Sequence, residues 1–228
     1  MLRQRFSGAQ WYEAVQDLDV TLIGLGGVGS WLSIFLSRIG CDIAAYEFDK
    51  VERHNIGGQL FGLSHINQYK DEAVKTMVYE FSERHIMMEG KYEKDSLTGM
   101  VVFSCADDMN VRKQSFTNWC KNVKKWNSNP THIVPIFIDA RMSMEYSEVY
   151  FVPPSNIERY KASLFSNNDA PDLACNMKAT SHVGAHTACI MVEGFVNHLA
   201  NCVMKEEIRE VPFKVVNETQ LILLDVEQ

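Results

Sequence analysis

A glycine-rich turn stands where a short apolar run gives way to helical spacing of apolar residues. Residues 20–23 are typical of a buried strand, and Gly24-Leu25-Gly26-Gly27-Val28-Gly29 follows directly. Glycines at such a junction let the backbone approach a phosphate, and the helix N-terminus offers free amides and a positive dipole end. Glu47 ends the next predicted strand, where a carboxylate in this kind of fold bonds a ribose hydroxyl. The turn predicts a mononucleotide or dinucleotide site; the alternative is a glycine turn that only allows close packing.

More polar residues follow in an order that helps to choose between ATP and a dinucleotide. Asp49 comes two positions after Glu47, Asn55 and Gln59 follow in the next segment, and Lys70 lies in a predicted helix. Farther on, an apolar strand over 100–105 ends in Cys105-Ala106-Asp107-Asp108, with Arg112 one helical turn beyond. Parallel strands present such residues at their carboxyl ends, over the crevice where open α/β sheets bind ligands.

Taken together, these motifs resemble the ThiF/MoeB/HesA family, the adenylating relatives of the ubiquitin-activating enzymes. That family combines G-x-G-G-x-G, D-x-D-x-V, S-N-L-x-R-Q-x-L/F, a later lysine and C-x-D-N-x-x-x-R. The segment Cys175-Asn176-Met177-Lys178-Ala179 is similar to the family's Cys-x-x-Ala-Gly ahead of its last core helix. The resemblance extends from about residue 18 to 204, and the combined spacing is more specific than any single motif.

The resemblance implies an ATP-dependent adenylyltransferase. Such an enzyme activates the C-terminal carboxylate of a small ubiquitin-like or sulfur-carrier protein, or of a peptide, ending in glycine. Two anions must meet, so cations and Mg²⁺ are needed around the phosphates. By the match, Asp107 is the Mg²⁺-site and catalytic carboxylate, Lys70 contacts the phosphates, and Arg112 orients Asp107 or binds the carrier tail. The nucleotide contacts would come from Gly24, Gly26, Gly27, Gly29, Glu47, Asp49, Asn55, Gln59 and Lys70.

Several of these residues also have a purely structural interpretation. Asp107 could cap a helix, although Asp108 suits that role better. Lys70 could be a solvated helix residue, and Asn55 and Gln59 could be amides that satisfy their own loop. Arg112 could form a surface salt bridge. Arg141, which follows a predicted strand, could line the channel for the carrier tail.

One departure from the family pattern concerns the phosphate site. The family places an arginine just before the glutamine, and Gly58 stands there in this chain. Losing a guanidinium from this kind of transition state would cost several kcal/mol. Arg53 could replace it, or Arg3 or Arg5 could reach in from the partner of a homodimer, as the resemblance implies. Otherwise the protein binds nucleotide and adenylates poorly.

The cysteines differ in what they suggest. Six are present and no two form a C-x-x-C pair, so we expect no zinc site and free thiols in a reducing cytoplasm. Cys175 matches the place where relatives carry a nucleophilic cysteine. A neighbouring Lys178 and a helix N-terminus would lower the pKa of its thiol. The alternative is a half-buried thiol beside the helix.

Composition limits the remaining function classes. The formal net charge is −7, which argues against a general nucleic-acid binder, and no apolar run is long enough to cross a membrane. We expect a cytoplasmic protein with one domain over residues 1–228. Two other functions stay open. One is an NAD-dependent oxidoreductase, which leaves Asn55, Gln59 and Lys70 unexplained; the other is a nucleotide-binding scaffold with weak catalysis, which Gly58 favours.

The elements that must position these residues alternate between strand and helix. Apolar patterns predict strands over 20–23, 43–48, 86–92, 100–105 and 133–138, with helices over 28–39, 64–82 and 108–126. This alternation predicts an α/β fold, Rossmann-like and doubly wound, with a mostly parallel sheet and added antiparallel strands near the C-terminus. Beyond residue 140 we expect a strand over 148–152, a polar crossover lid loop over 154–174, a helix over 180–203 and two strands around 217–218.

Overall fold

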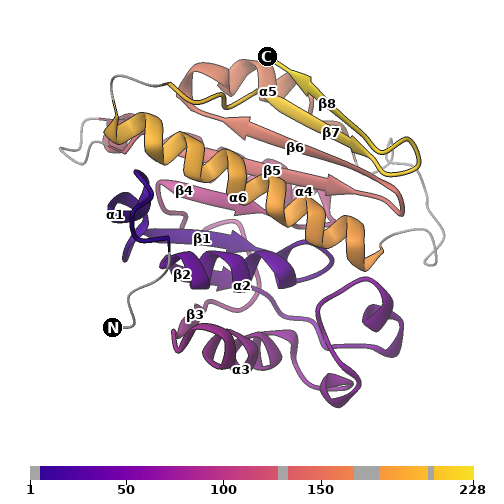
Figure 1. The fold of residues 1–228 in the computed structure, drawn as a ribbon. Helices are drawn as coiled ribbons and strands as arrows, with labels where there is room; N and C mark the ends of the chain where they lie inside the picture. Colours follow the sequence, from indigo (N-terminus) through magenta and orange to yellow (C-terminus); the bar gives the residue numbers. More distant parts are fainter. Residues whose placement is uncertain (1–5, 128–132, 167–179, 205–207) are drawn as a thin grey trace.

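The computed structural model describes residues 6–127, 133–166, 180–204 and 208–228 (Figure 1). One eight-stranded sheet runs through this part of the chain, in the order β3-β2-β1-β4-β5-β6-β7-β8. The parallel strands are β1 (Asp19–Ile23), β2 (Asp42–Tyr46), β3 (Ile86–Met88), β4 (Val101–Ser104) and β5 (Ile136–Met142). The antiparallel additions are β6 (Tyr146–Val152), β7 (Lys214–Glu218) and β8 (Leu223–Glu227). The predicted fold class is confirmed.

Helices cover both faces of the sheet. The α-helices are α1 (Tyr12–Val15), α2 (Gly29–Ile39), α3 (Lys70–Ser82), α4 (Met109–Asn127), α5 (Ile157–Ala162) and α6 (Ser181–Val203), and the short 3-10 turns are η1 (Arg53–Gly57), η2 (Leu63–His65) and η3 (Pro154–Asn156). Helices α2, α3 and α6 pack on one face with an aliphatic core, and α4 and α5 pack on the other with an aromatic core. In Figure 1, α6 runs across the sheet above α2.

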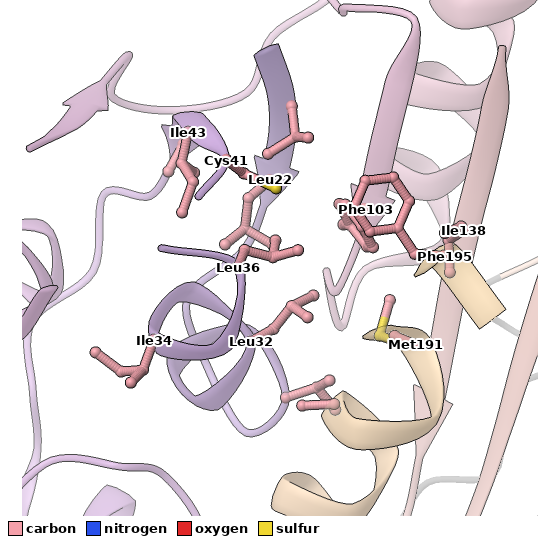
Figure 2. Close-up of a cluster of buried hydrophobic side chains, with 14 of the residues drawn as sticks. Leu22, Leu32, Ile34, Leu36, Cys41, Ile43, Phe103, Ile138, Met191 and Phe195 are labelled. Atoms are coloured by element: carbon pink, nitrogen blue, oxygen red, sulfur yellow. The ribbon is translucent and has the colours of Figure 1, made fainter. Parts of the chain in front are cut away.

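The aliphatic core joins the central strands to α2 and α6. Leu22, Phe103 and Ile138 extend from β1, β4 and β5 toward the two helices, as Figure 2 shows. Phe103 meets Phe195 of α6 edge to face, with ring centroids 5.2 Å apart. Both rings are fully buried, and removing a buried aromatic side chain typically costs about 3–5 kcal/mol. This face therefore fixes where β1 and β4 end, and with them the turns that follow.

The aromatic core changes the interpretation of the predicted lid. Residues 157–162 form α5, and its Tyr160 is fully buried with its ring 4.6 Å from that of Phe116 on α4. The segment appears polar in the sequence because few apolar side chains join α5 to the aromatic core, Tyr160 together with partly buried Ile157. The expectation of an irregular segment is wrong for residues 154–162, which form η3 and α5, whereas residues 163–166 are irregular and residues 167–174 lie outside the described residues. The crossover lid stays a prediction.

Three boundaries also differ from the sequence-based predictions. The helix expected over 64–82 begins at Lys70, because η2, a turn over residues 66–68 and a bridge from Tyr69 to Lys50 precede it. The strand expected over 86–92 ends at Met88, where its pairing with β2 stops. The last hairpin turns at residues 219–222, because Glu218 still pairs with Leu223. None of these changes moves the turns that follow β1, β2 and β4.

Candidate nucleotide site

Two positions of the glycine-rich turn have room only for glycine. Gly24 adopts a φ of +86°, and a Cβ there would lie 3.0 Å from the carbonyl oxygen of Cys105. A Cβ on Gly29 would lie 1.9 Å from the carbonyl oxygen of Gly24. The turn therefore packs directly against the segment after β4, and α2 begins within it. Its N-cap residue, Val28, has no side-chain acceptor for the first amides of the helix.

Glu47 holds the glycine turn to the end of β2. One carboxylate oxygen accepts the amide of Leu25 at 2.8 Å, and the other accepts the amides of Phe48 and Asp49 at 2.9 and 3.0 Å. The residue is buried. A carboxylate has about four acceptor positions, so these bonds leave room for one further donor. The ribose contact expected of Glu47 stays a prediction, and the structure adds an anchoring role.

Ser30 and Gln59 connect the glycine turn to the segment after η1. The hydroxyl of Ser30 donates to the carbonyl of Gly26 at 2.7 Å and accepts the amide of Leu60 at 3.1 Å. Gln59 Nε2 lies 3.8 Å from the place of a Cβ on Gly26. Gln59 Oε1 is buried and has no hydrogen-bond partner among the described residues. A buried acceptor without a donor beside a phosphate-type turn fits a ligand hydroxyl or amine.

Asn55 helps to position Gln59 through its backbone. Its Oδ1 accepts the amide of Glu52 at 2.8 Å, and its backbone carbonyl accepts the amides of Gly58 and Gln59. The alternative in which Asn55 satisfies its own loop therefore holds for the side-chain oxygen, Oδ1. The Nδ2 group remains as a donor for a ligand oxygen, so the predicted nucleotide contact is confined to that atom.

Lys70 and Asp49 form an ion pair at the start of α3. The Lys70 amide donates to the Asp49 carbonyl at 2.9 Å, and Nζ lies 3.2 Å from Asp49 Oδ2. The lysine side chain is 8% exposed, whereas that of Asp49 is 53% exposed. A solvated helix lysine is thus the wrong interpretation, because the stem is buried. The ammonium group is held next to the segment that carries Glu47.

The two neighbouring aspartates after β4 have separate environments. Asp108 Oδ1 accepts the amide of Asn110 at 2.7 Å and caps α4. Asp107 is exposed, and its carboxylate has no side-chain partner in the described residues. The Cys105 amide bonds the Ile23 carbonyl at 2.8 Å, which aligns this segment with the glycine turn. Asp107 is therefore available for a ligand, as the predicted Mg²⁺ role requires.

Arg112 lies away from its expected partner. It is buried and bonds Asp139 of β5, and no contact joins it to Asp107 in the described part of the chain. Arg141 Nε binds the other Asp139 oxygen at 3.1 Å, and its guanidinium lies 4.4 Å from the centre of the Tyr150 ring. The structure thus gives Arg112 a buried ion pair, and the alternative of a surface salt bridge is wrong. Its predicted role toward Asp107 or the carrier tail stays a prediction. Sequence reasoning missed Asp139, although its position directly after the strand predicted over 133–138 was a signal; the observed β5 extends through it to Met142.

Gly184 is a second residue that sequence reasoning missed. A Cβ there would lie 2.3 Å from the Gly27 carbonyl oxygen and 3.5 Å from that of Gly58. The first turn of α6 therefore touches both the glycine turn and the place where the family has an arginine. A glycine inside an apolar helix was the available signal. Arg53, which the sequence offers as a replacement for that arginine, is exposed at the start of η1.

Some predicted residues cannot be placed. Arg3, Arg5, Cys175 and Lys178 lie outside the described residues. Within residues 6–127, 133–166, 180–204 and 208–228, no group of three His, Cys, Asp or Glu side chains is arranged to hold a metal ion. A cation at Asp107 would thus take its other ligands from the nucleotide or water. None of the described helices is long and apolar enough to cross a membrane.

Comparison with known proteins gives one family and two groups of relatives. The model of the ThiF family matches residues 2–218. Ubiquitin-like modifier-activating enzyme 5 of Oryza sativa subsp. japonica is 33% identical over 79 residues, which is 34% of this chain and 19% of that protein. The Caenorhabditis briggsae protein of the same name is 28% identical over 131 residues, 49% of this chain and 30% of that protein. The matches thus span a third or less of these relatives.

Solved structures show the same fold. Escherichia coli MccB with ATP superposes with a TM-score of 0.65 at 13% identity, over 96% of this chain and 66% of that one. PaaA superposes with a TM-score of 0.67 at 15% identity, again over 96% and 66%. At such identities the likeness concerns the fold alone. It supports the observed order of strands around the glycine turn.

Proposed function

We propose that this chain, which belongs to the ThiF family, is an ATP-dependent adenylyltransferase that activates a C-terminal carboxylate. The observation that carries the proposal is the packing of Gly24 against the segment after β4. That packing brings a phosphate-type turn and an uncommitted carboxylate, Asp107, to adjacent strand ends. A dinucleotide oxidoreductase needs the turn and has no use for Asp107, Lys70 and Gln59 in this arrangement.

The proposed reaction joins two anions. A carboxylate oxygen of the substrate attacks the α-phosphorus of ATP, the bond from that phosphorus to the bridging oxygen breaks, and pyrophosphate leaves. The amides at the start of α2 and the Lys70 ammonium would stabilise the phosphate charge. Mg²⁺, when bound by Asp107 and the phosphates, would spread the charge that develops on the leaving group. Such electrostatic groups are each worth about 3–4 kcal/mol in comparable sites.

The names of the relatives support a class of substrate for the proposed reaction. The curated relatives are activating enzymes of a ubiquitin-like modifier, so we expect a small carrier protein or peptide ending in glycine. Cys175 would accept the activated acyl group where a thioester or sulfur transfer follows. A homodimer would let Arg3 or Arg5 of a second copy supply the cation missing at Gly58, and exposed Arg53 is the alternative source.

A scaffold with weak catalysis is the second candidate, because Gly58 leaves the phosphate site without its usual arginine. ATP–pyrophosphate exchange separates the two functions when it is measured with and without carriers ending in glycine. An adenylyltransferase incorporates labelled pyrophosphate into ATP only when the correct carrier is present. Tight ATP binding without exchange for any carrier would favour the scaffold. Thermal stabilisation by NAD in place of ATP would contradict both.

A further inference from the structure

Helix α4 carries charge of one sign only. The whole chain has a formal net charge of −7, yet the 19 residues of α4 contain no aspartate or glutamate. They include five cations, namely Arg112, Lys113, Lys121, Lys124 and Lys125. Exposed helices usually mix both signs along a face, because neighbouring opposite charges support the helix. Arg112 is buried against Asp139, so lysines alone supply the charge at the outer surface of α4.

Two adjoining hollows lie along this helix. The first has a volume of about 310 Å³ and includes Lys94, and the second has about 620 Å³ and includes Lys161 and Leu164. They share Lys113, Thr117 and Lys121, so they form one groove, here called the α4 groove. None of its lining residues is acidic. The second hollow also has an apolar part, to which half-buried Cys120 and Leu164 contribute.

The lysines of the α4 groove are mostly not neutralised by the protein. Lys94 and Lys113 have no ion-pair partner among the described residues, and Lys121 Nζ bonds only the neutral Oδ1 of Asn118 at 3.1 Å. Lys161, which lines the second hollow, pairs with Glu158 at 2.6 Å. Three like charges thus line one hollowed surface, an arrangement that a negative ligand would stabilise.

We propose that the α4 groove docks an acidic segment of a partner protein. Lys113 and Lys121 are about 12 Å apart along the helix at about 1.5 Å per residue, a span that exceeds one phosphate and suits about four extended residues. The apolar part would seat one aliphatic side chain of that segment. Nucleic acid is disfavoured because the aromatic ring of the groove, Phe116, is buried and offers no face for base stacking.

This docking does not depend on adenylation, although the α4 groove and Asp107 of the candidate nucleotide site are close in the sequence. Asn110, which lines the first hollow, lies three positions after Asp107 and in the first turn of α4. The nucleotide turn itself contributes no residue to the groove. A variant of the groove lysines therefore tests docking while leaving the glycine turn, Lys70 and Asp107 unchanged.

The test uses fluorescence anisotropy with the full chain and a labelled peptide of about eight residues, rich in Asp and Glu around one leucine. The groove variant Lys113→Glu/Lys121→Glu is compared with Arg38→Glu/Lys75→Glu, which changes the net charge equally on α2 and α3. We expect micromolar binding that weakens about tenfold between about 20 and 200 mM salt. The affinity for the peptide should fall at least about 30-fold in the groove variant and about twofold or less in the control variant.

Three results would overturn the docking proposal. Equal losses in both double variants would mean that the peptide responds to overall charge and not to the groove. Failure of the acidic peptide to bind at low salt would remove the predicted ligand. Tighter binding of an RNA oligonucleotide or of inorganic phosphate than of the peptide would assign the groove to another ligand. Thermal unfolding of all variants verifies that each is folded.

Discussion

The two faces of the sheet support the candidate site in different ways. On the face of α2, α3 and α6, backbone meets backbone, as where Gly184 lies against Gly27 and Gly29 against Gly24. On the face of α4 and α5, charged side chains meet in an aromatic core, as in the trio of Arg112, Asp139 and Arg141. Packing on the first face requires the absence of side chains, and packing on the second face places charged groups in the core.

The largest expected effect lies on the charged face. Asp139→Asn would leave Arg112 and Arg141 buried beside a neutral amide, and breaking a buried ion pair typically costs about 3–5 kcal/mol. We expect the free energy of unfolding from urea titration to fall by that amount. Glu227→Gln is the control, because its pair with Arg159 is exposed and worth about 1 kcal/mol or less. Equal losses in the two variants would mean that the buried trio contributes no more than a surface pair.

The next effect tests the backbone face. Gly29→Ala places a methyl group on the Gly24 carbonyl and would distort the turn, so we expect ATP affinity to fall about 100-fold, or about 2.7 kcal/mol. Gly57→Ala is the matched control, because a Cβ there meets nothing within 4 Å. Calorimetric titration with ATP measures both variants. Unchanged affinity in Gly29→Ala would separate the turn from nucleotide binding.

Some features of the two faces could be predicted from the sequence, and others could not, because they depend on contacts of different range along the chain. The glycine turn and the strand–helix alternation depend on neighbours in the chain, so local patterns indicated them. Glu47 was indicated by its place at the end of a predicted strand, although it bonds the distant amide of Leu25. Asp139, Tyr160 and Gly184 act on residues distant in the sequence, and no periodicity reports such a partner. The capping role of Asp108 lies between these cases, because capping preferences favoured Asp108 over Asp107 and the structure confirmed the cap.

A smaller effect compares one thiol from each face. Burial raises the pKa of Cys41, on the aliphatic face, far above its usual range, and it raises the pKa of half-exposed Cys120 to about 11. Only the thiolate reacts with iodoacetamide, so raising the pH toward 11 should speed the alkylation of Cys120 in the folded protein. Cys41 should stay protected until unfolding. Peptide mass spectrometry after alkylation near pH 9 measures both; faster labelling of Cys41 would contradict the assigned environments.

The central claim is that Asp107, and not its neighbour, serves the chemistry. The most direct measurement is ATP–pyrophosphate exchange with an active carrier, comparing Asp107→Asn with Asp108→Asn. Asparagine caps helices about as well as aspartate, so the second variant should keep α4 intact and exchange within about threefold. We expect the exchange rate of Asp107→Asn to fall about 100-fold or more, while its thermal stability stays unchanged. Exchange that survives in Asp107→Asn, or falls equally in both variants, would contradict the account.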